Sequence, residues 1–337
     1  MRERRSCLKK SRGLKNILCI ILLTCLICGC SSAYEADSSF ADAEEAVINE
    51  SEGPLADAAS IINDASENTE GEATMPEADR PKHPFGAGVF SWDHLADETD
   101  IECLVSNNIT EIYQYIKPEY SDDEIMDFLG RMSDRGIDVY ILDGEPSWAY
   151  KDNFRYMETI VDRIAYINNY VSRRERICGI VYDIEPYVLD KWHSTPDIIM
   201  DEYISNVSEV RDKIDRRGYN IEMCVCVPYS FDLMGYEAHL ESLIRNSDQV
   251  FVLNYNKNNE VENIRTEVEL ARDYEKRIVT VYEIQPGLLS QTNNSVTYYK
   301  DGLGAIVKSY DNIISSYEDK KIGIAYHTLN YLKILSQ

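Results

Sequence analysis

Two acidic residues follow an apolar segment near the middle of the chain. The segment reads GIVYDIEPY over residues 179–187, and its run of apolar residues predicts a buried β-strand. Since successive side chains of a strand point to opposite faces, Asp183 and Glu185 share one face. Pro186 cannot donate a hydrogen bond to a sheet, so we expect the strand to stop beside it. Burying two carboxyl groups is unfavourable unless they are paired or used, which favours a functional role.

Eight apolar segments alternate with amphipathic ones from about Pro84 to the end of the chain. The amphipathic stretches 121–136, 154–174 and 200–218 have helical spacing and predict outer helices. This alternation predicts an α/β fold, a (β/α)8 TIM barrel over residues 84–337, with an open doubly wound sheet as the alternative. Only a short helix can follow the last strand. The predicted strands are residues 87–93, 109–116, 137–145, 177–185, 221–229, 249–256, 277–285 and 321–329.

Polar and aromatic residues gather at the ends of these segments, whereas the segment middles are apolar. In a TIM barrel the functional residues lie at the C-terminal ends of the strands. Carboxyl groups and amides can bind sugar hydroxyls, aromatic rings can stack on sugar faces, and acids can hydrolyse a glycosidic bond. The sequence therefore predicts a carbohydrate site without metal or cofactor. The candidate substrate-binding residues are Trp92, Asp143, Glu145, Trp148, Tyr229, Asn254, Tyr255, Asn256, Tyr326 and His327.

The segment CGIVYDIE resembles the strand-four motif of family 18 glycoside hydrolases, the chitinase-like barrels, which runs Asp-Gly-x-Asp-x-Asp-x-Glu. Gly179, Asp183 and Glu185 match the motif, while Cys178 and Val181 replace its first two aspartates. LNYN at 253–256 resembles the strand-six pattern Met-x-Tyr-Asp. The strand-three pattern Ser-x-Gly-Gly is absent, and His327 stands where the family usually has tryptophan.

The resemblance to family 18 implies roles for the two acids. Glu185 would be the general acid, and Asp183 would orient the N-acetyl group of the substrate, which acts as the nucleophile in that family. Tyr255 would lie beside the reacting sugar. In that family the aspartate at the position of Val181 shares charge and a proton with the next aspartate. Its replacement implies that the charge and protonation of Asp183 differ in this chain.

A second enzymatic interpretation uses Glu283. Glu185-Pro186 and Glu283 resemble the acid/base and nucleophile positions of retaining barrel hydrolases, although Ile184 replaces the asparagine that usually precedes the acid/base. This interpretation requires the two carboxyl groups to lie about 5–5.5 Å apart. Glu283 could also form an ion pair at the rim, and His327 could be a packed histidine. Asp143 and Glu145 could cap a helix or bind a cation.

The sequence thus predicts a glycoside hydrolase that acts on a cell-wall or extracellular polysaccharide. Two alternatives from other classes stay open. The first is a barrel that has lost catalysis and binds a glycan or a protein partner at the cell surface. The second is a structural protein whose rim is merely solvated. A barrel fold cannot by itself decide among them.

The N-terminal residues predict export. Seven basic residues lie within the first fifteen, and the apolar run 17–27 is too short to span a bilayer. The following Ile-Cys-Gly-Cys resembles a bacterial lipobox, which implies a signal peptide over 1–29, lipidation of Cys30 and membrane anchoring on the extracytoplasmic face. An ordinary cleaved signal is the alternative. Residues 30–83 are acidic and poor in large apolar residues, which predicts a disordered tether.

Charge and cysteine content exclude other classes. The whole chain has 34 basic and 59 acidic residues, of which residues 1–29 contain 7 basic and 1 acidic. Without that segment the chain has 27 basic and 58 acidic residues. The resulting net charge of −31 repels phosphates, so we exclude nucleic-acid binding. Four of the nine cysteines lie in the signal, and a fifth is Cys30 of the lipobox. The others, Cys103, Cys178, Cys224 and Cys226, show no metal-site spacing.

Overall fold

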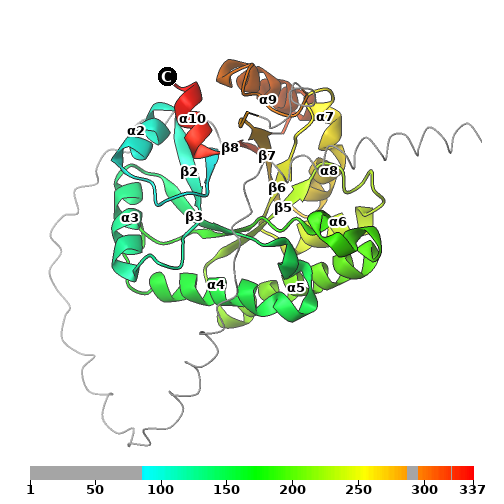
Figure 1. Cartoon of the computed structure of the whole chain (residues 1–337), viewed down its shortest axis with the longest axis horizontal. Helices are drawn as coiled ribbons and strands as arrows, with labels where there is room; N and C mark the ends of the chain where they lie inside the picture. The colour runs from blue at the N-terminus through cyan, green and yellow to red at the C-terminus, as the bar shows by residue number, and fades with distance from the viewer. Residues whose placement is uncertain (1–85, 287–294, 320) are drawn as a thin grey trace, which may run out of the picture. The chain divides into compact units, whose positions relative to one another are not determined.

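Eight parallel strands close into a barrel in the computed structural model, which describes residues 86–286, 295–319 and 321–337 (Figure 1). The strands pair in sequence order, and the eighth pairs back with the first. This confirms the predicted TIM barrel and makes the open-sheet alternative wrong. The strands are β1 (Ala87–Ser91), β2 (Ile109–Gln114), β3 (Asp138–Asp143), β4 (Gly179–Tyr182), β5 (Glu222–Pro228), β6 (Gln249–Leu253), β7 (Arg277–Glu283) and β8 (Ile322–His327).

A ring of helices surrounds the barrel (Figure 1). The predicted helices 121–136, 154–174 and 200–218 correspond to α3, α4 and α5, and the last helix is short, as expected. The α-helices are α2 (Glu98–Ser106), α3 (Asp122–Asp134), α4 (Phe154–Ile167), α5 (Pro196–Arg217), α6 (Glu237–Asn246), α7 (Glu260–Asn263), α8 (Arg265–Asp273), α9 (Leu303–Tyr317) and α10 (Leu329–Leu335). Short 3-10 turns follow β3 (Pro146–Ala149 and Lys151–Asn153) and β4 (Pro186–Val188 and Asp190–His193).

Local sequence explains where these helices begin and end. The hydroxyl of Ser121 accepts a hydrogen bond from the Glu124 backbone at 3.3 Å, and Glu124 accepts one from the Ser121 backbone, which completes the predicted capping box of α3. Gly218 has a left-handed backbone with φ of 64° and ends α5. The helix α4 ends earlier than predicted because the Asn168 side chain hydrogen-bonds both backbone groups of Ile177.

The strands have two buried faces. Val181 and Phe251 belong to a cluster inside the barrel, whereas Ile180 and Tyr182 belong to the layer between strands and helices. The alternation along β4 therefore places Val181 on the inner face. Continued to the end of the segment, it places Asp183 and Glu185 on that face too, as the sequence predicts.

A polar network fills the N-terminal end of the barrel. Arg277 donates to the carboxylate of Glu111 at 2.7 Å and to the side-chain oxygen of Gln249 at 3.0 Å. Gln249 in turn donates to Glu222 at 2.5 Å, and the Tyr140 hydroxyl donates to the same carboxylate at 3.0 Å. The network closes one end of the barrel with paired charges and leaves the other end for a site.

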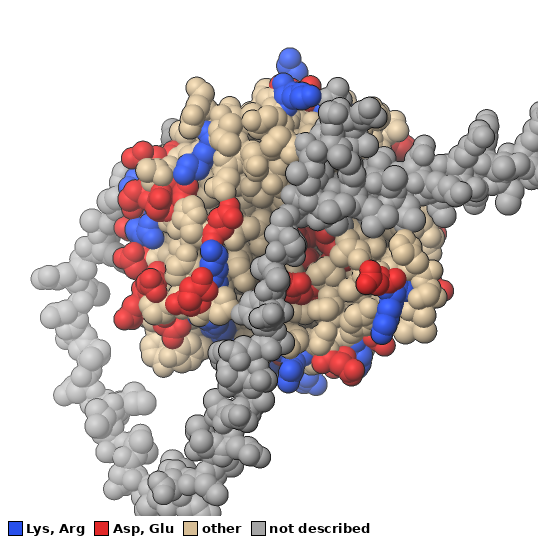
Figure 2. Space-filling model, in the orientation of Figure 1, with Lys and Arg blue, Asp and Glu red and all other residues tan. Residues whose placement is uncertain are grey.

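Groups of charged side chains lie on the outer surface among uncharged ones (Figure 2). Figure 2 shows acidic side chains gathered over α2 and α3, with Lys and Arg among them. Exposed ion pairs explain part of this pattern, such as Arg131 with Asp127 at 3.1 Å and Arg135 with Glu98 at 3.5 Å. Exposed pairs each contribute only about 0–1 kcal/mol, so these charges matter more for solubility than for the fold.

One buried carboxyl group lies in the helix layer. Glu267 of α8 is fully buried, and neither of its carboxyl oxygens has a hydrogen-bond partner among the described residues. Burial raises its pKa well above the usual 4.5, and the charge of Asp232 adds to this effect. The folded state therefore holds a proton on Glu267 that the unfolded chain releases as the pH rises above about 4.5.

We expect Glu267→Gln to stabilise the protein increasingly as the pH rises from about 5 to 8. The free energy of unfolding of the native chain should fall by up to about 1.4 kcal/mol per pH unit in this range, because folding must keep Glu267 protonated. An amide of the same shape does not ionise. Thermal unfolding of both chains at several pH values measures the difference. A constant difference between pH 5 and 8 would contradict the prediction.

The N-terminal predictions lie outside the described residues. These are the signal over 1–29, lipidation of Cys30 and the acidic tether over 30–83. Among the described helices, none combines the length and the apolar character that crossing a membrane requires. In the same part of the chain, Cys103, Cys178, Cys224 and Cys226 are free thiols.

Candidate functional site

The C-terminal ends of the strands form the mouth of the barrel, and Asp183 and Glu185 lie there directly after β4. Both are buried, with 8% of each residue exposed. The backbone N–H of Asp183 donates to the carbonyl oxygen of Asp143 at 3.0 Å, which fixes the first residue after the strand. A Cβ at Gly144 would lie 2.3 Å from the carbonyl oxygen of Asp183, so glycine is required for this close approach.

Glu185 has a hydroxyl partner two residues further on. The Tyr187 hydroxyl donates to Oε1 of Glu185 at 2.5 Å. Pro186 begins the 3-10 turn that carries Tyr187 back toward Glu185. The sequence predicts that the strand stops beside Pro186, but β4 ends earlier, at Tyr182, and the proline instead starts the turn that brings this partner into place.

Asp183 is held in an environment that disfavours its charge. Its Oδ1 is buried and has no hydrogen-bond partner among the described residues. Burial raises its pKa, whereas the positive charge of His327 and a hydrogen bond with the Cys226 thiol act in the opposite direction. A buried carboxyl oxygen without a protein partner is a group that a ligand could satisfy.

Glu283 and His327 form a buried pair across two adjacent strands. They are register partners at the ends of β7 and β8, and only 2% and 1% of these residues are exposed. Nδ1 of His327 lies 3.1 Å from Oε2 of Glu283 and 3.1 Å from Nε2 of Gln285. The other oxygen of Glu283 accepts a hydrogen bond from the Gln285 backbone at 2.6 Å. Both oxygens of Glu283 are thus engaged.

Surrounding carboxylates favour a protonated His327. Burial alone would lower its pKa, but the charge of Glu283 and its hydrogen bond, together with the charges of Asp183 and Glu185, raise the pKa above 6.5. The three acids and the imidazole thus belong to one electrostatic unit. The sequence places all four at strand ends, and the charges of all three acids act on the imidazole.

Aromatic rings flank this unit. The Tyr255 ring lies 6.3 Å from the imidazole of His327, and Phe90 contacts the same imidazole edge to face at 5.6 Å. Trp92 packs against the cluster inside the barrel, 5.9 Å from the Tyr115 ring. Tyr255 thus lies beside His327, whereas Trp92 lies against the inner cluster.

Several predicted substrate-binding residues lie elsewhere. Tyr326 belongs to the buried layer between strands and helices, because it alternates with the inward-facing His327. Trp148 belongs to the same layer and stacks on Tyr156 of α4 at 5.9 Å. The Asn254 amide donates to the carbonyl oxygen of Glu260 at 3.0 Å and therefore anchors the start of α7.

The remaining candidates lie next to the strand ends. Tyr229 and Asn256 hydrogen-bond each other; burial raises the pKa of Tyr229, and this bond opposes the rise. Burial raises the pKa of Asp143 to about 7, although a hydrogen bond from Gly144 opposes the rise. Glu145 stands just before the first 3-10 turn after β3, and burial raises its pKa too.

Sequence reasoning missed three partners of the site, namely Tyr187, Cys226 and Gln285. Tyr187 and Gln285 each lie two residues after a candidate acid, Glu185 and Glu283, and Cys226 lies two residues after Cys224. The same period of two could have identified them. An ordinary tyrosine, cysteine or glutamine carries no further signal in the sequence.

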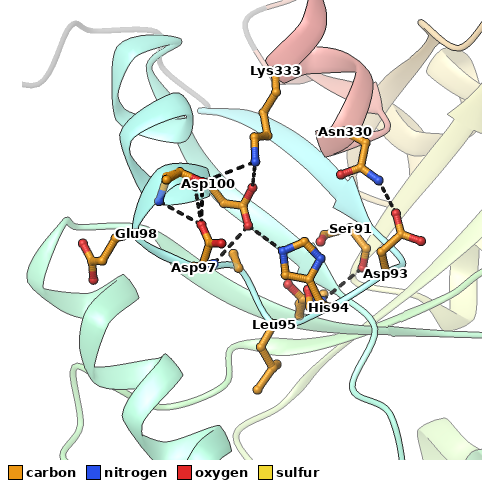
Figure 3. Close-up of polar contacts among 12 residues, drawn as sticks. Ser91, Asp93, His94, Leu95, Asp97, Glu98, Asp100, Asn330 and Lys333 are labelled. Carbon is orange, nitrogen blue, oxygen red and sulfur yellow. Dashed lines mark hydrogen bonds and ion pairs between the residues drawn. The ribbon is translucent and has the colours of Figure 1, made fainter.

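A second polar cluster does not include the three acids or His327. It joins the loop after β1 to α10 (Figure 3). His94, Asp97 and Asp100 offer ligand atoms within 4.8 Å of one another, a grouping that the sequence analysis did not predict. Asp100 is fully buried and lies 2.9 Å from Nε2 of His94 and 2.5 Å from Nζ of Lys333. Its carboxylate also completes the capping box of α2 with Asp97. Capping and the ion pair account for this cluster.

Comparison with solved structures finds chitinase barrels. A class V chitinase mutant from Cycas revoluta, in complex with (GlcNAc)3, has 11% identity and a TM-score of 0.48, and the match covers 74% of this chain and 97% of that one. The class V chitinase of Nicotiana tobaccum has 13% identity and a TM-score of 0.47, with 72% and 93% covered. A Group II chitinase domain from Ostrinia furnacalis has 12% identity and a TM-score of 0.41, with 64% and 69% covered.

These structures include GH18 chitinases, the family that the strand-four motif of this chain resembles. At such identities and TM-scores the likeness carries no assignment of residues or substrate. No family model and no curated protein matches the sequence.

Proposed function

We propose that the protein is a glycoside hydrolase, with Glu185 as the general acid and Asp183 as its helper. One observation carries the proposal: two buried carboxyl groups lie on the inner face directly after β4, in one electrostatic unit with His327 and Glu283. An oxocarbenium-like transition state needs a proton donor and a nearby negative charge, and this arrangement offers both.

The proposed reaction follows from these positions. Glu185 gives its proton to the glycosidic oxygen, and the bond between that oxygen and the anomeric carbon breaks. The Tyr187 hydroxyl stabilises the carboxylate that Glu185 becomes, because it already donates to Oε1. The carbonyl oxygen of an N-acetyl group on the substrate attacks the anomeric carbon, and Asp183 orients that group. Water then opens the intermediate and returns a proton to Glu185.

Contacts of Glu283 favour this reaction over the alternative that makes Glu283 the nucleophile. Its Oε1 accepts from the Gln285 backbone and its Oε2 faces His327. A nucleophilic carboxylate has to present one oxygen to the anomeric carbon, whereas Asp183 has a buried Oδ1 without a protein partner in the described residues. Glu283 then serves as the counter-charge of His327.

The proposed substrate is a cell-wall or extracellular polysaccharide that contains N-acetylhexosamine. Its N-acetyl group supplies the nucleophile of the proposed reaction. Export and a lipid on Cys30 would hold the enzyme on the extracytoplasmic face of the membrane, close to such a polymer. The strongly acidic chain disfavours polyanionic glycans.

A polysaccharide panel tests the proposal. The full chain is incubated with chitin, peptidoglycan and glycans that lack N-acetyl groups, and both new reducing ends and binding are measured. We expect reducing ends from polymers with N-acetylhexosamine and none from the others. Binding without release would overturn the hydrolase and favour the rival binding module. Neither binding nor release would overturn both.

A further inference from the structure

Five exposed arginines lie in two segments at the N-terminal end of the barrel. Arg173, Arg174 and Arg176 belong to the loop before β4, and Arg216 and Arg217 are the last two residues of α5, just before β5. Among the described residues, none of the five guanidinium groups has an ion-pair or hydrogen-bond partner. We call these five residues the arginine patch.

The two segments lie side by side. Gly179 and Glu222 are register partners at the starts of β4 and β5, and the Glu222 backbone donates to the carbonyl oxygen of Cys178 at 2.9 Å. Both segments also line one cavity of about 210 Å³, Arg176 from the first and Gly218, which follows Arg217, from the second. This cavity is smaller than the ~300–1,000 Å³ of pockets for drug-sized ligands, and it suits a small polar group.

Acids next to the patch are mostly engaged elsewhere. Glu175 accepts a hydrogen bond from the Ser172 backbone at 2.9 Å, and Asp215 pairs with Arg211 at 2.6 Å. Asp138 is an exposed acid at the same end of the barrel. The net charge of the chain without residues 1–29 is −31, but charges more than ~8 Å apart are largely screened at physiological ionic strength. The patch therefore attracts anions locally.

Two exposed tyrosines border the same cavity. Tyr166 and Tyr170 are 48% and 63% exposed, and their ring centroids lie 4.9 Å apart. Between them in the sequence stand Asn168 and Asn169, which line the cavity. Tyrosine rings favour the boundary between water and a bilayer, and arginines are attracted to anionic headgroups. The combination fits a membrane surface better than a dissolved anion.

The position of the patch in the fold agrees with this partner. The described chain begins at Gly86, and β1 starts at the same end of the barrel as the patch. The proposed lipid on Cys30 is therefore joined to the barrel from this end. The 22 residues of α5 span about 33 Å, and Arg216 and Arg217 stand at the end of this helix away from the mouth. A surface against the patch leaves the mouth open.

We propose that the arginine patch is a docking surface for an anionic membrane, and that the cavity beside Arg176 takes one phosphodiester headgroup. The N-terminal end of the barrel then rests on the bilayer, and the mouth faces the extracellular polymer. No covalent bond forms or breaks in this contact. The proposal concerns attachment and goes beyond the proposed hydrolysis, on which it does not depend.

Vesicle binding tests this docking surface. The full chain is mixed with vesicles of phosphatidylglycerol or of phosphatidylcholine, and the bound fraction is measured by sedimentation. The double variant Arg176→Gln with Arg217→Gln removes one charge from each segment. We expect it to bind phosphatidylglycerol about 30-fold more weakly than the native chain, because each arginine beside an anionic surface strengthens binding about fivefold. Binding to phosphatidylcholine should not change.

Lys300→Gln with Lys308→Gln is the matched control. These lysines are exposed, stand before and within α9, and have no ion-pair partner among the residues that the structure describes. The control removes the same charge, and its binding should stay within about twofold of the native chain. Native binding by the arginine double variant would overturn the proposal. Equal losses in both double variants would do so too, since they would report net charge alone.

Chemical modification locates the contact on the barrel. Phenylglyoxal reacts with accessible guanidinium groups, and mass spectrometry of peptides reports the reaction of each arginine. We expect phosphatidylglycerol vesicles to protect the arginine patch and to leave Arg155, exposed near the start of α4, reactive. Equal reaction of the patch with and without vesicles would contradict the docking surface.

Other occupants of the patch give other patterns of modification. Glycerol phosphate offers the same headgroup in solution, and equal protection by it would assign the cavity to a free phosphate ester and overturn the membrane as partner. Protection without vesicles would assign the patch to a protein occupant and overturn it as well. A chain that docks on vesicles but releases no reducing ends overturns the proposed hydrolysis and leaves the docking surface standing.

Discussion

Glu185→Gln is expected to slow polysaccharide hydrolysis by about 10²- to 10⁴-fold, the range that general acid catalysis contributes. The amide keeps the shape of the carboxyl group and can still accept a hydrogen bond from Tyr187, but it has no proton to give to the glycosidic oxygen. Since the contact with Tyr187 survives, Tm should change little. Initial rates of reducing-end release, beside thermal unfolding, measure the two effects.

Glu119→Gln provides the matched control for this prediction. Glu119 is an exposed acid in the loop after β2, so the same substitution occurs on the same side of the barrel but outside the buried unit. Its hydrolysis rate should stay within about twofold of the native rate, since exposed positions rarely matter for packing or charge. Normal turnover in Glu185→Gln would remove the general acid from the proposed reaction.

Arg277→Met should have the largest effect on stability. The guanidinium donates to Glu111 and Gln249 inside the N-terminal end of the barrel. Without it, Glu111 is a buried carboxylate that still accepts a hydrogen bond from the Tyr113 hydroxyl at 2.7 Å but has lost its ion-pair partner. Removing one partner of a buried ion pair costs about 3–5 kcal/mol. Chemical denaturation of both chains measures this loss in the free energy of unfolding.

Two further variants make the Arg277 prediction specific. Arg135→Met removes an arginine from an exposed pair with Glu98 and should cost less than about 1 kcal/mol. Adding Glu111→Gln to Arg277→Met should restore part of the lost stability, because no unpaired charge is left behind. A loss below about 1 kcal/mol in Arg277→Met would show that the network is dispensable.

The barrel could be predicted because its signals are local. Each strand is a short apolar run, and residues such as Ser121 and Gly218 mark helix ends by their own chemistry. The early end of α4 could not be predicted in this way. It depends on the Asn168 side chain meeting the backbone of Ile177, nine residues away, and no periodicity encodes that contact.

The candidate site could be predicted only in outline. The period of two along β4 placed Asp183 and Glu185 on one face, and a closed barrel brings the ends of β7 and β8 to the same mouth. The sequence did not show that one oxygen of Glu283 accepts a hydrogen bond from the Gln285 backbone while the other contacts His327. Nor did the sequence show that His327 faces the barrel interior while Tyr326 faces the helices. Adjacent residues at a strand end differ only in which face they occupy.

The cluster of Asp100 and Lys333 sets an order of events during synthesis. The buried carboxylate of Asp100 belongs to the first described helix, and the ammonium group that pairs with it lies 233 residues further along the chain. Until that lysine has left the ribosome, the amino-terminal part of the barrel carries an acid without its cation partner. The domain therefore reaches its final stability only after nearly the whole chain has been synthesised.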